Sequence, residues 1–250
     1  MAEDYFTDRR SVRHYQDREV PGDLVKSIVE RAIRAPTCGN MQLYTVVMTK
    51  DKEMKSRMEP LHFNQPASTG CSVILTVCAD FNRFSRWCEL SVAKPGYDNF
   101  HSFIVAMTDA VIITQQIVTI AEMEGLGTCY LGTVNYNAED IADLLKLPEL
   151  VVPVACISLG YPAGDEEQCE RLPVEAVLHE ETYRNDSDEE IMNFFKAKDD
   201  FPANKEFVKE NNKESLAQVF TDIRYPEDVN LSVSESFAKL LEKKGFIKNK

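Results

Sequence analysis

Hydrophobic residues along the chain alternate between helical spacing and short continuous runs, which predicts helices and buried strands in alternation. Segment 23–34 places its Leu, Val, Ile and Ala residues on one helical stripe, after the start signal Pro21-Gly22 and before Pro36. Three β-branched or fully apolar runs predict strands: 43–49, 72–79 and 152–160. The short piece 128–131 is apolar as well. This pattern is typical of an α/β or α+β protein with helices layered on a sheet.

The most hydrophobic stretch, 103–123, has the length of a membrane-spanning helix. It contains Asp109, Gln115 and Gln116, and polar groups of this kind make insertion into lipid costly. The composition therefore favours a long helix buried nearly all round, in a core or a subunit interface. Gly125 is placed to end this helix.

Beyond Tyr161 the apolar runs give way to prolines and acidic residues. An amphipathic helix is predicted at 138–147 before this change, and only two helices after it, at 188–197 and 232–246. Such a tail cannot bury a core of its own. We therefore expect a core domain at 1–186 and an extension at 187–250 that wraps the core or a partner subunit.

The net charge of −13 argues against a nucleic-acid or membrane partner, because both favour a basic protein surface. Residues 165–200 alone hold 13 acidic against 4 basic residues, a balance of −9, which indicates a solvated face. The opening residues carry charges where a signal peptide needs an apolar core, so we expect a cytoplasmic protein. The 7 cysteines show no CxxC pair and are expected to be reduced and packed as small hydrophobic residues.

The strongest chemical signal is the run Arg9-Arg10-Ser11-Val12-Arg13. In a helix or turn, positions 9 and 13, or 10 and 13, would project two guanidinium groups to one side beside the Ser11 hydroxyl. Planar, permanently charged donors of this kind suit a phosphate dianion. The alternative is a set of ordinary surface ion pairs to nearby aspartates.

Two glycine-containing loops could contact a flat ligand. The loop 35–42 is built of small and amide residues, and Gly39 permits close backbone approach. Glycines at 125–132 follow a helix instead of a strand, which excludes the dinucleotide-binding fingerprint. The four histidines are scattered, and no metal motif or nucleophile motif is present. Anion anchoring without a nucleophile is expected where a cofactor supplies the reactive atom.

Taken together, the motifs resemble the nitroreductase family, nearest to its larger NADPH-preferring subgroup of nitroreductases and flavin reductases. The matching pieces follow family order across nearly the whole chain: RRSVRHY, APTCGNMQ, VCADFNRF, GLGTCYLGTVNYN, LGYP, ERLP and the segment 220–247.

The resemblance implies an α+β, three-layer fold with a central, mostly antiparallel sheet flanked by helices, an extended C-terminal arm, and a homodimer with two FMN sites at its interface. Arg9, Arg10, Ser11 and Arg13 would bind the phosphate, ribityl chain and pyrimidine edge, and Arg171 would reach the phosphate. Gln65 and the Tyr130-Leu131-Gly132 backbone would face the ring. The partner subunit would supply a loop set: Thr37, Cys38, Gly39, Asn40 and Gln42.

The implied reaction is ping-pong hydride transfer from NADPH or NADH through FMN to a small-molecule electron acceptor such as a nitroaromatic, a quinone or free flavin. It requires no protein acid or base, so no catalytic residue and no metal ligand is assigned. One departure concerns the redox potential: the subgroup's usual lysine before Glu170-Arg171 is Cys169 here. Losing a positive charge near the reduced ring is expected to lower that potential unless Arg13 compensates.

Two alternatives remain open at this point. One is another flavin reaction on the same scaffold, such as enone reduction or dehalogenation. The other is a non-catalytic protein that binds flavin or another anion.

Overall fold

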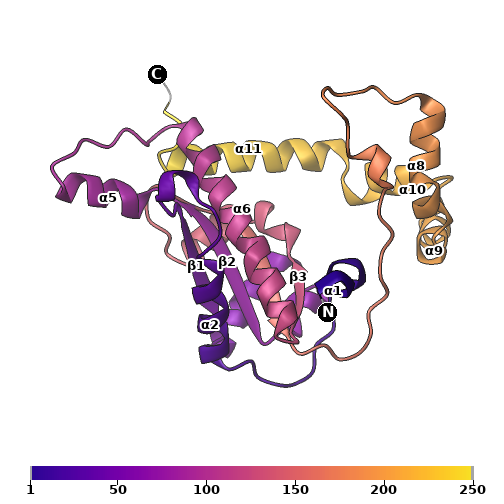
Figure 1. Cartoon of the computed structure of the whole chain (residues 1–250), viewed down its shortest axis with the longest axis horizontal. Coiled ribbons are helices and arrows are strands. Elements are labelled where there is room, and N and C mark those ends of the chain that lie inside the picture. Colours follow the sequence, from indigo (N-terminus) through magenta and orange to yellow (C-terminus); the bar gives the residue numbers. More distant parts are fainter. Residues whose placement is uncertain (1, 249–250) are drawn as a thin grey trace. The chain divides into compact units, whose positions relative to one another are not determined.

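The computed structural model describes residues 2–248 and divides the chain into two compact units (Figure 1). The first unit consists of the residues up to Glu166 together with those from Val233 onward, and the second is Glu167–Ser232. Each unit is described by itself below. The predicted division into a core at 1–186 and an extension at 187–250 stays a prediction.

Within residues 2–248, the first unit is built on a four-stranded sheet. Its strands lie in the order β1 (Tyr44–Thr49), β2 (Val73–Asp80), β4 (Val151–Gly160) and β3 (Gly127–Tyr130). Neighbouring strands are antiparallel throughout, and Gly127 lies opposite Gly160 in the β3–β4 pair. The three predicted strands form where they were expected, and the apolar piece at 128–131 becomes most of β3. The antiparallel sheet with its helices makes the fold α+β, as the resemblance implied.

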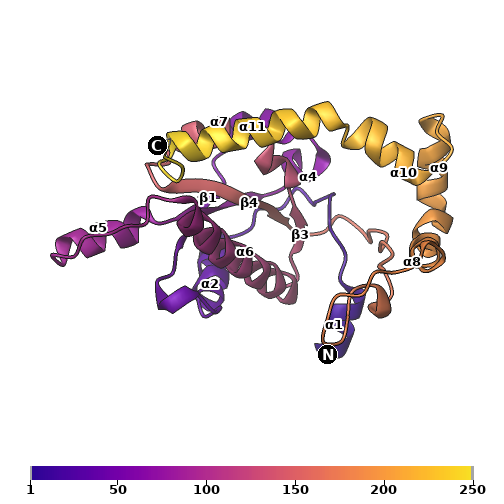
Figure 2. The same cartoon turned by 90° about the horizontal axis from the view of Figure 1, so that it is seen from above.

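Two helices, α2 (Gly22–Ala32) and α6 (Phe100–Met123), cover one face of this sheet (Figure 2). Val25 and Ile28 of α2 and Ile113 and Ile117 of α6 are buried together with Leu75. By length and composition alone α6 could cross a membrane, but 50% of its most apolar window is buried inside the protein. It is the core helix of the unit, but one side of it is exposed in this chain, at Phe100, Val111 and Met123, so burial nearly all round is not seen within one chain. Gly125 ends the helix with a φ of 79°.

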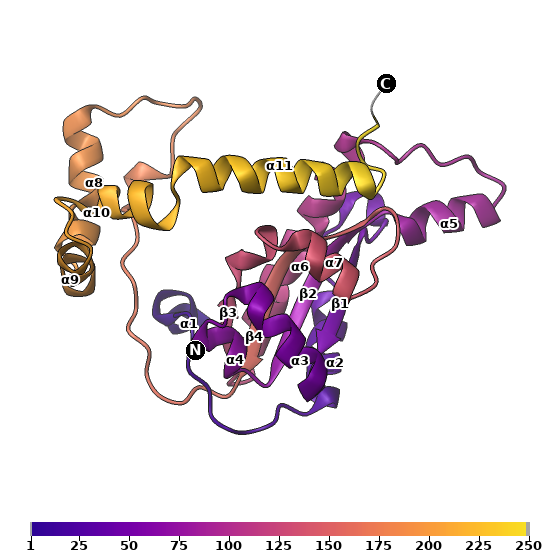
Figure 3. The ribbon, with the colours of Figure 1, turned by 180° about the vertical axis from the view of Figure 1, so that it is seen from behind.

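Shorter elements cover the opposite face of the sheet (Figure 3). These are α3 (Lys52–Met58), the 3-10 turn η2 (Glu59–His62), α4 (Pro66–Thr69), the 3-10 turn η3 (Gly132–Asn135) and α7 (Ala138–Leu144). Met58, Leu131, Ile141 and Cys156 pack in one apolar cluster beneath them. The sheet therefore lies between two helical layers, which is the expected three-layer arrangement. Helix α7 ends before the predicted limit at 147, because Lys146 takes a left-handed conformation.

Helices α1 (Ala2–Asp8) and α5 (Asn82–Leu90) were not predicted from the sequence. The long helix α11 (Glu227–Lys243) was predicted, but it begins five positions before residue 232. Its anchors Leu240 and Leu241 are buried with Phe103 and Phe246, and Gly245 ends it with a φ of 82°.

The second unit contains more helix than the sequence predicted. Besides the 3-10 turn η4 (Val174–Ala176) and the expected α8 (Asp188–Asp200), it has α9 (Pro202–Glu210), α10 (Leu216–Val219) and the π-helical turn η5 (Phe220–Arg224). The prediction of only two helices after Tyr161 is therefore wrong. Neither α8 nor α9 has a buried residue, but α8 begins with a capping box between Ser187 and Glu190, whereas α9 has no side-chain cap. Helix α9 is only 9 residues long, too short for a repeating apolar stripe to stand out in the sequence.

All seven cysteines are free thiols. Five are buried, and burial raises the pKa of Cys71 to about 11 and that of Cys156 to about 12. These buried thiols behave as the small hydrophobic residues that were predicted. The 3-10 turn η1 (Cys38–Asn40) exposes Cys38, and Cys169 is also exposed.

Candidate functional site

The arginine run lies against the β3 edge of the sheet in an extended conformation. The helix or turn that would have aligned positions 9 and 13 does not form, because α1 ends at Asp8. Val12 is buried instead, and its backbone N–H donates to the Thr128 carbonyl at 2.9 Å. The segment is thus fixed by its backbone and by one apolar side chain.

A pair of glycines on neighbouring strands makes this close packing possible. A Cβ atom on Gly127 would lie 2.6 Å from the Val12 side chain, and one on Gly160 would lie 2.5 Å from the Tyr15 ring. Gly127 and Gly160 face each other across β3 and β4, so Val12 and Tyr15 lie on a flat patch of backbone. The Tyr15 hydroxyl donates to the Val12 carbonyl at 2.7 Å, which links the two residues directly.

The three arginines of the run have different partners. Arg9 forms an ion pair with Glu122 at 3.4 Å, and Arg10 donates to the backbone carbonyls of Asp8 and Glu166 at 3.3 and 3.1 Å. The Arg13 side chain is exposed and has no hydrogen bond or ion pair with the side chains described, those of residues 5–248. Of the three, Arg13 has the charge most available to a ligand.

The positive charges of Arg9 and Arg13 nevertheless both act on the Cys129 side chain in β3. Burial raises the pKa of the Cys129 thiol, and the positive charges of Arg13 and Arg9 both oppose that rise. Burial also raises the pKa of Tyr130 to about 12, again opposed by Arg9. The two guanidinium groups therefore place positive potential at the end of β3.

Glu166 clamps the backbone of this segment. Its Oε1 accepts from the backbone N–H groups of Arg13 and His14 at 2.9 and 3.0 Å and lies 2.9 Å from His14 Nδ1. The hydrogen bond from the Arg13 N–H is the largest cause that lowers the pKa of Glu166. Sequence reasoning placed Glu166 only within a solvated acidic stretch, since no local pattern marks a contact 153 positions away.

Gln65 and the Tyr130-Leu131-Gly132 backbone lie close together at the same edge. Gln65 Nε2 donates to Thr133 Oγ1 at 3.2 Å, and Thr133 directly follows Gly132. A Cβ atom on Gly132 would meet nothing within 4 Å, and the Tyr130 side chain is 39% exposed. The backbone at Gly132 is thus open to a flat ligand.

The loop Thr37–Gln42 is anchored to a buried carboxylate. Asp109, in the middle of α6, accepts from the Thr37 hydroxyl, from the Cys38 N–H at 2.9 Å and from the Leu43 N–H at 3.3 Å. Gly39, Asn40 and Gln42 all have positive φ values near 55°, a backbone conformation that residues other than glycine rarely adopt. Asp109 had entered the sequence argument only as a residue unfavourable in lipid, although a lone acid in an apolar helix indicates a buried polar anchor.

The loop Thr37–Gln42 and the arginine segment Arg9–Arg13 lie far apart within one chain. The loop is anchored at Asp109, whereas Arg9 pairs with Glu122, which is 13 positions further along α6. At a rise of about 1.5 Å per residue, these anchors are separated by about 20 Å. The loop also precedes β1, and β1 and β3 are opposite edges of the sheet. One chain therefore does not bring the two predicted sets of residues together.

Arg171 belongs to the second unit. It is exposed, and its Nη1 donates to the carbonyls of Cys169 and Glu170 at 3.1 and 2.9 Å. Its predicted role at a phosphate stays a prediction.

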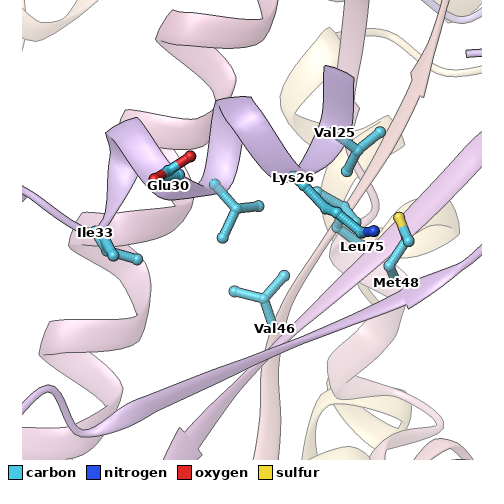
Figure 4. A pocket seen from close by; sticks show the side chains of 8 residues that line it. Val25, Lys26, Glu30, Ile33, Val46, Met48 and Leu75 are labelled. Atoms are coloured by element: carbon cyan, nitrogen blue, oxygen red, sulfur yellow. The ribbon is translucent and has the colours of Figure 1, made fainter. Parts of the chain in front are cut away.

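An apolar hollow, separate from the predicted site residues, lies between α2 and β1 (Figure 4). Apolar side chains including Val25, Ile33, Val46 and Met48 line it, with Lys26 and Glu30 beside them. It lacks the convergent polar donors that orient a ligand. Among the side chains that the structure describes, those of residues 5–248, no group of three from His, Cys, Asp or Glu is placed to hold a metal ion.

The fold and the site residues define a class of α+β protein that presents positive charge and open backbone to an anionic, flat ligand. The chain belongs to the Nitroreductase family, whose model matches residues 6–80 and 90–161.

Known proteins support this membership across the whole chain. An FMN reductase [NAD(P)H] of Bacillus subtilis (strain 168) is 32% identical over 96% of this chain and 95% of its own length. An oxygen-insensitive NADPH nitroreductase of Salmonella typhimurium is 30% identical over 70% of this chain and 71% of its own. A crystal structure from Bacteroides fragilis NCTC 9343, provisionally described as an oxidoreductase, is 45% identical with a TM-score of 0.96, covering 98% of this chain and 100% of its own.

Proposed function

We propose that the protein is an FMN-dependent oxidoreductase that transfers electrons from NADPH or NADH to nitroaromatics, quinones or free flavin by ping-pong hydride transfer. The observation that carries this proposal is the unpaired Arg13 guanidinium, on the segment that packs against β3 just before the open backbone at Gly132. Relatives that are named as NAD(P)H-dependent FMN reductases and as an NADPH nitroreductase support it.

The residues at the β3 edge fit the chemistry of FMN. A phosphate dianion needs charged donors, and Arg13 and Arg10 have no carboxylate partner among the described residues. A flat ring needs open backbone and a polar amide, which Gly132 and Gln65 provide. The bound flavin supplies the hydride chemistry, while the chain supplies binding and electrostatics. Ser11 is half-buried between these arginines, where its hydroxyl is expected to contact the ribityl chain.

The separation of the two residue sets supports a homodimer. A second copy of the chain would bring its Thr37, Cys38, Gly39, Asn40 and Gln42 to the arginine segment of the first. Apolar side chains that remain exposed on α6, such as Phe100, Val111 and Met123, are expected to lie in this interface. Residues 187–250 are proposed to wrap the core or the partner. Arg171, within the predicted core domain 1–186, is proposed to reach the phosphate.

The remaining proposals concern partners and location. We infer a small-molecule acceptor, which the relatives named as an FMN reductase and a nitroreductase support. We infer no nucleic-acid or membrane partner, because the chain carries a net charge of −13. We also propose a cytoplasmic location, which the seven free thiols support.

Reconstitution tests the proposed function. The purified chain is incubated with FMN, freed of excess flavin, and titrated anaerobically with NADPH and separately with NADH. We expect flavin absorbance that bleaches with a nicotinamide nucleotide and returns when a nitroaromatic is added. A chain that retains no flavin, or that retains flavin that neither nucleotide reduces, would contradict the proposal and favour the non-catalytic alternative.

A further inference from the structure

His62 is a completely buried histidine at the end of η2, next to the predicted flavin site. An imidazole shielded from water needs a partner for each of its nitrogens. Here Nδ1 lies 2.7 Å from Thr133 Oγ1, and Nε2 lies 3.5 Å from Cys156 Sγ. Both nitrogens are therefore paired inside the protein.

The Thr133 hydroxyl links His62 to Gln65. Gln65 Nε2 donates to the same Oγ1 atom at 3.2 Å, so the hydroxyl touches both side chains. The backbone joins them too, since the Gln65 N–H donates to the His62 carbonyl at 3.3 Å. Asn137 Nδ2 further ties this turn to the loop after η3 by donating to the Leu61 carbonyl at 2.8 Å.

The available hydrogens favour one assignment of donors and acceptors in the hydrogen bonds that join Gln65, Thr133 and His62. Burial lowers the pKa of His62 to about 4, so the ring is neutral at neutral pH and has one donor and one acceptor nitrogen. The Thr133 oxygen accepts from Gln65, and directing its single hydrogen at His62 Nδ1 gives that hydrogen an acceptor as well. The ring hydrogen then lies on Nε2 and points at the Cys156 sulfur, so every group has a partner.

We propose that His62 is a positioning residue that acts through the Thr133 hydroxyl to fix which end of the Gln65 amide faces the flavin ring. Without the acceptor nitrogen of His62, the Thr133 hydrogen is free to point at Gln65. The amide then turns so that its oxygen accepts from Thr133, which exchanges donor and acceptor at the ring. This inference rests on the proposed function, because it assumes that FMN binds beside Gln65.

Hydrogen bonds to the ring distinguish oxidised from reduced flavin, since the two forms differ in charge and in ring hydrogens. Reversing the Gln65 amide is therefore expected to change the ratio of the two affinities. A tenfold change in that ratio corresponds to about 30 mV for a two-electron couple. The midpoint potential reports this change independently of turnover.

The experiment compares three variants with the wild-type protein after FMN loading. Thr133→Val removes the hydroxyl with little change of shape, Thr133→Ser retains it, and His62→Phe removes both ring nitrogens. We expect Thr133→Val and His62→Phe to shift the midpoint potential by about 30 mV in the same direction, whereas Thr133→Ser stays near wild type. Circular dichroism and the flavin spectrum establish that each variant is folded and loaded.

A second comparison isolates the route through Gln65. In a Gln65→Leu background, Thr133→Val is expected to cause no further shift, because the side chain it orients is absent. Unchanged potentials in the Thr133→Val and His62→Phe variants would overturn the inference while leaving the proposed function intact, as would an equal shift with and without Gln65. If His62→Phe does not fold, the Thr133→Val comparison alone decides. A wild-type chain that takes up no FMN would overturn both proposals.

Discussion

The arginine segment Arg9–Arg13 and the loop Thr37–Gln42 are predicted to hold the same cofactor, yet the protein builds them in opposite ways. The segment is extended, is packed on two glycines and presents an unpaired charge at Arg13. The loop carries no charge and is held in left-handed conformations by the buried Asp109. The first region contributes electrostatic attraction, whereas the second contributes a preformed shape. Substitutions in the segment are therefore expected to weaken the attraction for the cofactor, whereas substitutions at the loop's anchor are expected to disturb its conformation.

The largest expected effect is at Arg13. Arg13→Ala should raise the dissociation constant for FMN by about 100-fold, because a charge-assisted contact to phosphate contributes up to about 3 kcal/mol. Arg13→Lys should retain part of the affinity, since it keeps the charge and loses the planar fork. Fluorescence titration measures both. Arg57→Ala, an exposed arginine on α3, is the matched control and should bind FMN normally.

The second-largest effect is expected at Asp109, which anchors the loop Thr37–Gln42. Asp109→Asn replaces one of the two accepting oxygens by an N–H₂ group, which then faces at least one of the three donors and should lower the free energy of unfolding by about 2–4 kcal/mol. FMN affinity should fall as well, because the loop loses its fixed conformation. Chemical denaturation and limited proteolysis at the loop check this, with the exposed Asp140→Asn as control. Proteolysis of the loop unchanged from wild type would show that Asp109 does not hold it.

A smaller effect is expected at Gly127, which supports the arginine segment without touching a ligand. Gly127→Ala places a Cβ atom 2.6 Å from Val12 and must displace the segment. FMN affinity should fall by about 10-fold, while the fold is retained at a cost of about 1–3 kcal/mol for overpacking. Gly96→Ala, where a Cβ meets nothing within 4 Å, is the matched control. Equal affinities for the two variants would exclude a supporting role.

The smallest effect concerns Glu166 and depends on pH. Hydrogen bonds from Arg13 and His14 lower the pKa of Glu166, so its ionised form stabilises the folded state above its unfolded pKa. That contribution is lost as the pH falls through the lowered folded-state pKa. Glu166→Gln should therefore reduce the Tm by roughly 2 °C above about pH 5. The difference from wild type should shrink in more acidic solution, and Glu167→Gln should show no such difference at any pH.

The sequence predicted regular elements well where burial repeats with a fixed period. Helix α2 and strands β2 and β4 follow from continuous stripes and runs of apolar residues. Helix α9 did not follow, since its 9 residues are too few to show a repeating apolar stripe, and α5 has buried positions only at Ser85 and Cys88. The sequence also suggested a helix or turn for the arginine run, whereas the run lies outside any helix. Its extended conformation depends on Gly127 and Gly160, which are more than 100 positions away in the sequence.

The candidate site was predictable as a set of residue types but not as a set of contacts. Arg13 and the glycine loops stood out by composition, and the family resemblance assigned them to FMN. Glu166, Asp109 and His62 were not assigned roles, because each acts through partners distant in sequence. Long-range hydrogen bonds of this kind leave no periodic signal in the sequence.

The most direct test of the account is the number of flavins bound by a mixed dimer. Chains carrying Arg13→Ala and Asp109→Asn are co-expressed with different affinity tags, and the doubly tagged species is titrated with FMN. If each site combines the arginine segment of one chain with the loop of the other, one site contains both defects and the other contains neither. We predict one high-affinity FMN per mixed dimer and none in the Arg13→Ala homodimer. A mixed dimer without a high-affinity site would contradict the account, as would a chain that does not dimerise.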